Sequence, residues 1–298
     1  MNIQKKKLNI TKARRRVQIR SALLLTLGAC CLVSLLRIAL AGVVLPYALR
    51  FLLETLVTLL AFGGGAYLGL CVLDGDHRKI VPLRLLSRAQ MLWFSLLGML
   101  AVCPMALASD LPGALVGGQA EAAAVVMDSS RFLAQAVKSA LIAPVCEELF
   151  FRGYLLHALQ RDGRLRAGAV TALCFALVHM NGAGNLGAYV LLGLLLALIA
   201  FRTGSLLAPI LVHACYNLTL LMLSGAGLSG MITGWSMIAC VVRLAGCAAF
   251  AAVLKRAYTA RGDGRTFVLW EDGRLSRRET ALLTAAGALL LLSLIVGG

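Results

Sequence analysis

The sequence predicts an all-α fold, namely a polytopic bundle of about eight to nine transmembrane helices. Hydrophobic residues make up 60% of the 298 residues and charged residues only 14%, well below the ~25% that is typical of soluble proteins. The mean hydropathy is +0.87. Several apolar runs reach the ~20 residues that cross a bilayer as a helix, and short basic clusters separate them.

Nine apolar segments are the predicted spans, and only the loops 110–130 and 255–278 between them are long. The first span follows a basic segment, 1–20, and no clear small-residue cleavage site follows it, so we expect a retained helix and not a signal peptide. The loop 255–278 contains a β-rich run followed by Asp272-Gly273, which is typical of a hairpin, and an irregular basic linker is the alternative for this loop. The predicted spans are 20–45, 51–73, 90–109, 131–159, 167–181, 185–201, 204–223, 232–254 and 279–296.

The positions of the basic residues predict the orientation of these spans. With a cytoplasmic N-terminus, the segments on the inside hold 23 of the 29 Lys and Arg residues, and the outside loop 110–130 holds none. This asymmetry is what the positive-inside rule requires. We therefore expect an integral, multi-pass membrane protein with a cytoplasmic N-terminus and an outside C-terminus. The inside segments are 1–20, 74–90, 160–166, residue 202 and 255–278.

The net charge of +16 does not indicate a nucleic-acid partner. The basic residues lie between apolar runs, with few aromatic residues among them and without a groove-reading motif. The expected partners are the lipid bilayer and a substrate that the membrane anchors.

Two adjacent glutamates in an apolar segment are the most unusual feature of the chain. Ionisable groups cost several kcal/mol inside a bilayer, so each is expected to have a function or a partner. Glu148 and Arg152 are four residues apart with the acid first, which favours a helical ion pair. Glu147 points about 100° away from Glu148 on a helix and has no local partner. It is therefore the better candidate for a general base.

Three further polar residues occur at the same predicted depth. His179 follows Phe175 by four residues, and Asn217 follows His213 by four, so each pair shares one helix face. Glu147 and these residues lie 11 to 15 residues from the nearest cytoplasmic anchor, at a depth of roughly 20 Å. Three helices thus place polar groups in one layer of the membrane, which predicts a shared polar site inside the bundle.

These motifs resemble the signature of the CAAX-processing and bacteriocin-processing (CPBP) intramembrane protease family, and in particular its type II CAAX prenyl endopeptidases. The elements are EExxxR at 147–152, FxxxH at 175–179 and HxxxN at 213–217. All three are intact and in order, and the resemblance covers roughly 130–223. Outside this stretch the helices resemble the family only as generic flanking spans.

The resemblance implies a peptidase and assigns a part to each motif residue. Glu147 would activate a water and Glu148 would support the site through Arg152. His179 would position the water or stabilise the oxyanion, and His213 and Asn217 would complete the site. Phe175 and Arg152 are structural supports. The substrate does not follow from the resemblance, and neither does its prenylation.

A metal remains an open alternative at this point. Glu147, His179 and His213 are tentative ligands for zinc or another divalent metal, because two histidines and a carboxylate can bind zinc and leave one position for water. The chain has no HEXXH motif, and a metal-free site of Glu, His and Asn is chemically adequate too.

Two other functions could use the same polar layer. The first is a transporter or channel, although the inverted repeats typical of such proteins are not evident. The second is a non-catalytic scaffold or immunity protein, which the intact motif set disfavours. We predict four regions: a basic cytoplasmic segment at 1–20, N-terminal helices at 21–130, a CPBP-like catalytic core at 131–223 and C-terminal helices at 224–298.

Overall fold

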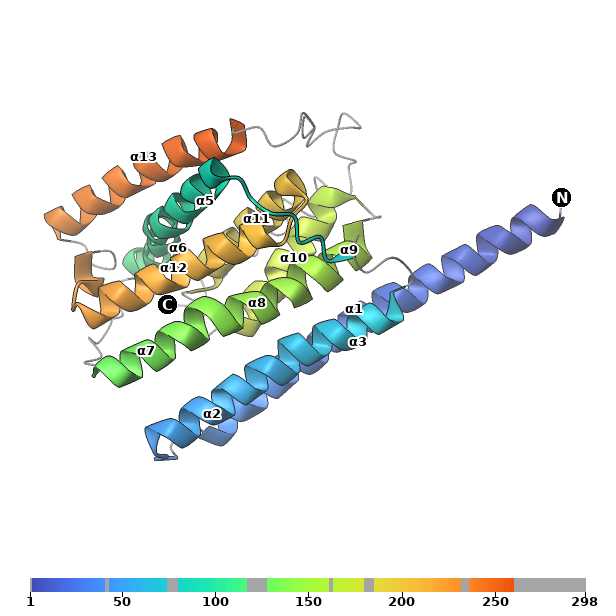
Figure 1. Ribbon diagram of the computed structural model, residues 1–298, viewed down its shortest axis with the longest axis horizontal. Coiled ribbons are helices and arrows are strands. Elements are labelled where there is room, and N and C mark those ends of the chain that lie inside the picture. The colour runs from blue at the N-terminus through green and yellow to red at the C-terminus, as the bar shows by residue number, and fades with distance from the viewer. Residues whose placement is uncertain are drawn as a thin grey trace.

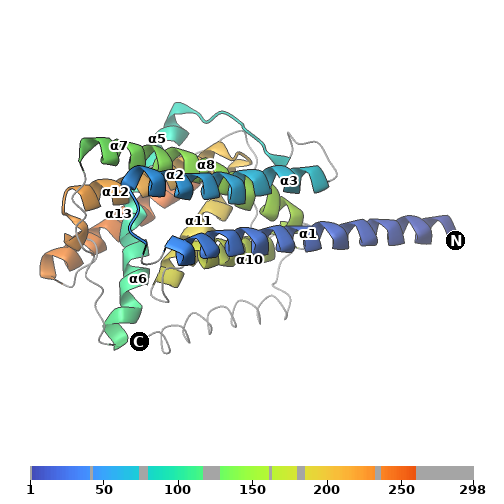
Figure 2. The same ribbon diagram turned by 90° about the horizontal axis from the view of Figure 1, so that it is seen from below.

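The computed structural model describes residues 2–40, 43–73, 80–116, 128–160, 163–179, 185–231 and 236–259, and within them the secondary structure is helical. The all-α class is confirmed. Figure 1 shows most helices running in a similar direction, with α1 (Asn2–Leu40) extending beyond the others at its N-terminal end. In Figure 2, α6 (Val102–Val116) runs across the direction of α1 and of α10 (Arg164–His179).

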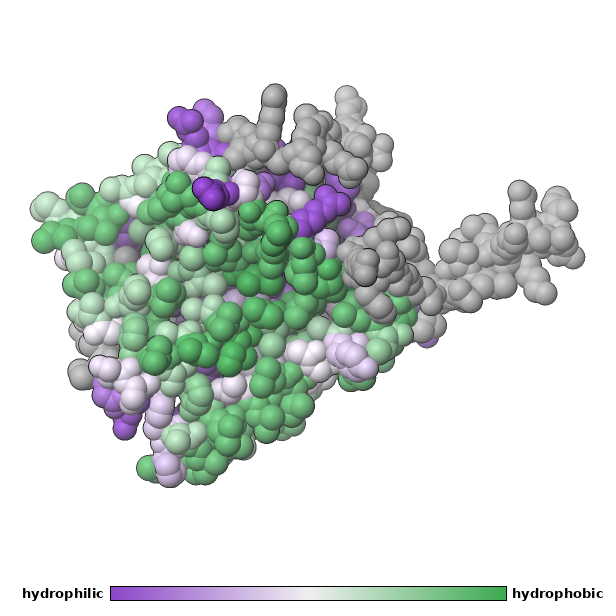
Figure 3. Space-filling view, in the orientation of Figure 1, coloured by the Kyte–Doolittle hydropathy of each residue, from purple (hydrophilic) through white to green (hydrophobic). Residues whose placement is uncertain are grey.

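Among the residues that the structure describes, five helical stretches are long and apolar enough to cross a membrane. They indicate an integral, multi-pass membrane protein, and the predicted count of eight to nine spans is not confirmed. Large apolar side chains such as Val44, Leu85 and Met237 are exposed, and Figure 3 shows hydrophobic residues covering much of one face, as lipid contact requires. The five stretches are Tyr47–Val72, Arg88–Ser109, Leu186–Thr203, Leu207–Gly225 and Met237–Ala257.

The remaining elements follow the predicted order along the chain. α1 begins within the basic segment 1–20, so this segment is the start of a long helix. The predicted hairpin within the loop 255–278 and the last predicted span, 279–296, lie outside the described residues. Residues 255–259 of that predicted loop belong to α13. The bounds are α2 Tyr47–Thr58, η1 Leu59–Gly64, α3 Gly65–Val72, α5 Arg88–Leu100, α11 Leu186–Thr203, α12 Leu207–Gly225, η6 Ser229–Met231 and α13 Met237–Thr259.

The predicted single helix 90–109 is wrong in one respect, since α5 ends at Leu100 and α6 begins at Val102. Pro104 accounts for the break, because it has no N–H and is tolerated only in the first turn of a helix. At its other end α5 begins with a capping box, in which Ser87 and Gln90 each accept a hydrogen bond from the backbone N–H of the other.

The predicted helix 131–159 is a series of five consecutive helical elements. α-Helical pieces alternate with two wider π segments, η2 and η3, which flank the short α8 that carries both glutamates. Such π segments are frequent at functional sites. The elements are α7 Ser129–Val137, η2 Lys138–Ile142, α8 Ala143–Glu148, η3 Leu149–Leu155 and α9 Leu156–Leu159.

Pro144 explains why one carbonyl of η2 lacks a partner within the helix. The Ala143 N–H donates to the carbonyl of Lys138, five residues back. The Ser139 carbonyl would need either that N–H or the N–H of residue 144, and proline has none. A second helix therefore has to supply a donor to this carbonyl.

Two glycines of α3 let η3 pack closely against it. A Cβ on Gly65 would lie 2.8 Å from the Phe150 ring, and a Cβ on Gly69 would lie 2.6 Å from the Tyr154 ring. Small residues four apart permit this kind of approach between membrane helices. Phe150 and Tyr154 are fully buried as a result, and they fix the helix that carries the glutamates.

Candidate active site

Glu147 lies in the interior of the bundle with two imidazoles beside it. It is 5% exposed, and its Oε2 atom lies 3.2 Å from Nε2 of His179 and 3.8 Å from Nε2 of His213. These histidines come from α10 and α12, so three helices meet at one carboxylate oxygen. The predicted convergence of Glu147, His179 and His213 is observed, and the carboxylate without a partner on its own helix lies beside two imidazoles from other helices.

Glu148 forms the predicted ion pair with Arg152 across one turn. Nη1 of Arg152 donates to Oε1 of Glu148 at 2.7 Å, and both side chains are completely buried. The second amino group, Nη2, donates to the Gly193 carbonyl of α11 at 2.9 Å. The Arg152 guanidinium also lies 4.8 Å from the centre of the Phe175 ring, a favourable cation–π distance. The pair therefore joins η3 to α10 and α11.

His213 connects the two glutamates, and this connection was not predicted. Its Nδ1 lies 3.0 Å from Oε1 of Glu148, the same oxygen that accepts from Arg152. A carboxylate only accepts, so Nδ1 of His213 is the donor. In a neutral imidazole Nε2 then carries a lone pair, and this lone pair is on the side of Glu147. Glu148 thus sets the tautomer of His213 as well as pairing with Arg152.

His179 is held in the same tautomer by a different group. Its Nδ1 lies 2.8 Å from the Phe175 carbonyl one turn earlier, and since a carbonyl only accepts, Nδ1 carries the hydrogen. Its ring lies 4.3 Å from the Phe175 ring and 5.1 Å from the Tyr189 ring, measured between centroids. The two aromatic rings restrict rotation of the imidazole, which directs Nε2 toward Glu147.

Asn217 lies one turn beyond His213 and contacts a different part of the site helix. Its Nδ2 donates to the Ser139 carbonyl at 2.7 Å. This is the carbonyl that Pro144 deprives of a helical donor, so Asn217 satisfies a backbone group that would otherwise be unpaired. The amide has a second N–H and a carbonyl oxygen for other partners.

The structure brings most of the predicted site residues together. Glu147, Glu148, His179 and His213 form one buried polar cluster, and Arg152 and Phe175 support it as expected. Sequence reasoning missed Tyr189, Gly193 and Ser139, which contribute a ring and two carbonyls. Of these only Gly193 carried a signal, since a glycine inside an apolar helix often marks close packing. A Cβ there would lie 2.8 Å from Cα of Ala172.

Lys138 lies in η2, one helical element before the glutamates, but belongs to a different set of charges. It pairs with Glu54 of α2, and Glu54 also pairs with Arg50 at 3.2 Å, as expected for residues four apart. These charges form a separate network and do not join the glutamate cluster.

The metal hypothesis gains no support from the arrangement of ligands. Among the residues that the structure describes, no group of three or more His, Cys, Asp or Glu side chains is arranged to hold a metal ion. Glu147, His179 and His213 offer donor atoms of the right type, an oxygen and two nitrogens, and they lie together at the distances given above.

Comparison with known proteins places the cluster in a family context. Residues 129–219 match the family model described as type II CAAX prenyl endopeptidase Rce1-like, so this part of the chain forms an Rce1-like domain. All the motif residues from Glu147 to Asn217 lie within the match. Neither the curated proteins nor the solved structures include a significant match to the chain.

Proposed function

We propose that this protein, with its Rce1-like domain at 129–219, is an intramembrane endopeptidase that hydrolyses a peptide bond in a membrane-associated peptide or protein. One observation carries the proposal. Two imidazole nitrogens from separate helices lie within 4 Å of one carboxylate oxygen of Glu147 in a buried site. A family match to a protease implies a peptide or protein as the substrate.

The tautomers indicate how the cluster acts on water. Oε2 of Glu147 and Nε2 of His179 are both acceptors when the two groups are ionised and neutral, respectively. A water against both would donate one O–H to each, and its lone pair would remain for attack on a carbonyl carbon. Glu147 would take the proton as the peptide bond is attacked, and later deliver it to the departing amine. His179 would orient the water.

His213 and Asn217 are the proposed groups on the carbonyl side of the reaction. A protonated Nε2 of His213, or the second N–H of the Asn217 amide, could donate to the oxygen that becomes negative during attack. Glu148 stabilises such an imidazolium, because its carboxylate already accepts from Nδ1 of His213 at 3.0 Å. Glu148 and Arg152 are then positioning residues for His213.

The orientation proposed from the basic residues places the N-terminus in the cytoplasm. The expected result of cysteine labelling is that a probe outside the cell reaches position 120 but not position 263. The experiment needs a chain in which accessible native cysteines have been replaced. Labelling of both positions from the same side would contradict the arrangement of spans.

The proposed activity is tested with purified protein and membrane-anchored peptides in prenylated and non-prenylated forms. Mass spectrometry should detect two products that together account for one added water, and Glu147→Ala should abolish them. The prenyl comparison identifies the substrate class. Wild-type protein that yields no product from a broad library of membrane-anchored peptides would favour a scaffold or a transporter with the same polar layer.

A further inference from the structure

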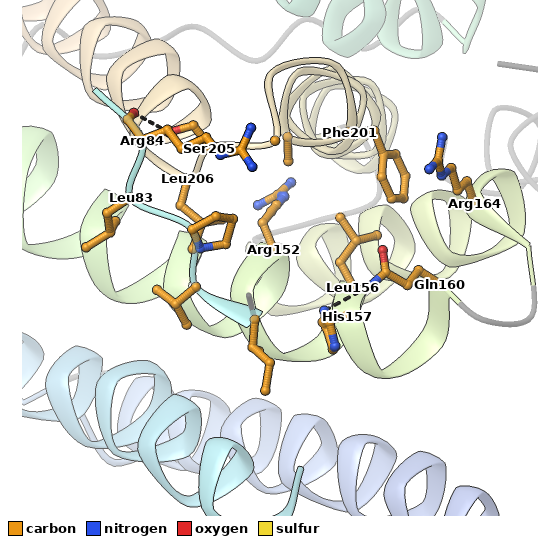
Figure 4. Close-up of a pocket in the computed structure, with 15 residues that line it drawn as sticks. Leu83, Arg84, Arg152, Leu156, His157, Gln160, Arg164, Phe201, Ser205 and Leu206 are labelled. Atoms are coloured by element: carbon orange, nitrogen blue, oxygen red, sulfur yellow. Dashed lines mark hydrogen bonds between the residues drawn. The ribbon is translucent and has the colours of Figure 1, made fainter. Parts of the chain in front are cut away.

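A cavity of about 640 Å³ opens at one end of the bundle, away from the glutamate cluster. It lies where the segment before α5, the α9–α10 turn and the α11–α12 turn meet, and Arg152 is at the centre of its lining residues in Figure 4. Glu147, His179 and His213 do not line it. The cavity is therefore a separate site that shares only Arg152 with the cluster.

The charge of the lining is positive. Arg84, Arg152 and Arg164 line the cavity, with His157 and Gln160 beside them, and its described lining contains no Asp or Glu. Arg152 is 3% exposed, and its Nε atom is buried without a hydrogen-bond partner among the described residues. Guanidinium groups are the side chains best suited to binding phosphate oxygens.

The backbone around the cavity is held in place. Ser205 donates its hydroxyl to the Arg84 carbonyl at 2.7 Å, and the Leu206 N–H donates to the Pro82 carbonyl at 2.8 Å. Gly204 ends α11 in the left-handed conformation, with φ of 58°, which a glycine adopts readily. These bonds fix the segment that carries Arg84 against the start of α12, so the cavity is formed without a ligand.

The position and the apolar part of the lining favour a lipid headgroup as the source of the phosphate. Leu83, Leu156 and Phe201 line the same cavity as the arginines, so the site offers donors and an apolar wall together. The N-terminal part of α1, with its run of lysines and arginines in the sequence, projects from this end of the bundle (Figure 1). Basic pockets between membrane helices are suited to anionic headgroups.

We propose that this cavity binds a phosphate group, that of an anionic phospholipid headgroup or free phosphate, through the exposed Arg84 and Arg164. The Arg152 side chain is completely buried, so it would add positive charge behind the phosphate and make no contact with it. Nη1 of the same guanidinium donates to Glu148, so the buried charge that would attract the phosphate also belongs to the ion pair beside the catalytic cluster.

The test measures binding directly and does not depend on peptidase activity. Full-length protein in neutral detergent is titrated with short-chain phosphatidylglycerol, short-chain phosphatidylcholine or inorganic phosphate, and the rise in unfolding temperature gives an apparent Kd. Phosphatidylglycerol should stabilise the wild type and phosphatidylcholine should not. Stabilisation by inorganic phosphate at comparable concentrations would show that the phosphate group alone is recognised, whereas its absence would identify the lipid as the source.

Matched pairs of arginine variants distinguish a built site from general attraction to a basic surface. Arg84→Gln with Arg164→Gln should weaken phosphatidylglycerol binding about tenfold or more. Arg88→Gln with Arg166→Gln removes the same charge from exposed neighbours outside the lining and should change it less than twofold. The four positions are exposed, so the variants should fold. Equal losses of phosphatidylglycerol affinity in the two pairs of variants would overturn the proposal. So would a wild type that neither phosphatidylglycerol nor inorganic phosphate stabilises.

Discussion

Glu148 has two separable roles in the structure, and a set of variants at Glu148 and Arg152 can distinguish them. Its Oε1 atom accepts from Arg152 at 2.7 Å and from Nδ1 of His213 at 3.0 Å. Glu148→Gln keeps an oxygen for both donors but removes the negative charge. Arg152 is then a completely buried cation without a counter-ion, and breaking a buried pair in this way costs ~3–5 kcal/mol. The main loss should be in stability and abundance.

A second change at Arg152 should then separate folding from catalysis. Glu148→Gln with Arg152→Met removes the orphaned charge and leaves an acceptor for His213, so stability and part of the activity should return. Glu148→Leu with Arg152→Met should also fold, but His213 has no acceptor in it, so activity should stay low. The assay is reporter cleavage per amount of folded protein, with thermal unfolding measured alongside.

Two results would refute this account of Glu148. One is a Glu148→Gln variant that folds like the wild type and is inert, since Glu148 would then act in the chemistry itself. The other is equal activity of the two double variants, since His213 would then not depend on the acceptor at position 148.

Three further predictions follow from the packing and the site. Asn217→Ala should lower stability by ~1 kcal/mol, the lower end of the cost of an unpaired buried carbonyl, because this hydrogen bond is only partly buried. Adding Pro144→Ala should recover part of the loss by returning a backbone donor, and a double variant no more stable than Asn217→Ala would contradict this explanation. Gly69→Ala should destabilise by ~1–3 kcal/mol because its Cβ would lie 2.6 Å from a buried ring, whereas Gly28→Ala, with nothing within 4 Å of its Cβ, should change the unfolding temperature little. Direct activation of water by a carboxylate predicts that chelation changes the cleavage rate less than twofold, and a loss that zinc restores would instead assign ligand roles to the cluster.

The site was largely predictable because its determinants are local in sequence. The spacing of Glu148 and Arg152 specifies a helical ion pair wherever the helix lies. The depths of Glu147, His179 and His213 could be compared by counting along each helix from its predicted cytoplasmic end, at Gln160, Arg166 and Arg202 respectively. Counting residues along the chain therefore placed side chains of three helices at one depth without any knowledge of how the helices pack.

What the sequence could not predict depends on which helices are neighbours. The second partner of Glu148, His213, lies 65 residues away, and Lys138 pairs with Glu54 at a separation of 84 residues. No periodicity within one helix contains such information. Sequence reasoning missed the break between α5 and α6 and the π segments around the glutamates for a different reason. An apolar run has the same composition whether its helix is regular, broken or locally widened, so hydrophobicity alone does not distinguish these backbones.

Asn217 was predictable in one respect and not in another. Its place on the same face as His213 was predicted, but its partner depends on a detail of another helix. Pro144 removes one backbone donor and η2 uses the other for Lys138, so the Ser139 carbonyl needs a donor from another helix. Pro144 is evident in the sequence, but the unpaired Ser139 carbonyl could not be predicted from it. In an ordinary α-helix the N–H of Ala143 would donate to that carbonyl.

The most direct test of the central claim is the cleavage rate of Glu147→Gln at equal amounts of folded protein. The substitution keeps the size of the side chain and one acceptor, but the amide cannot take a proton from water. The account predicts a rate at least ~100-fold below that of the wild type with unchanged abundance. Glu54→Gln, the same change at a partly exposed ion pair, should cleave at close to the wild-type rate. A Glu147→Gln protein that cleaves within a few-fold of the wild type would contradict the assignment of Glu147 as the base.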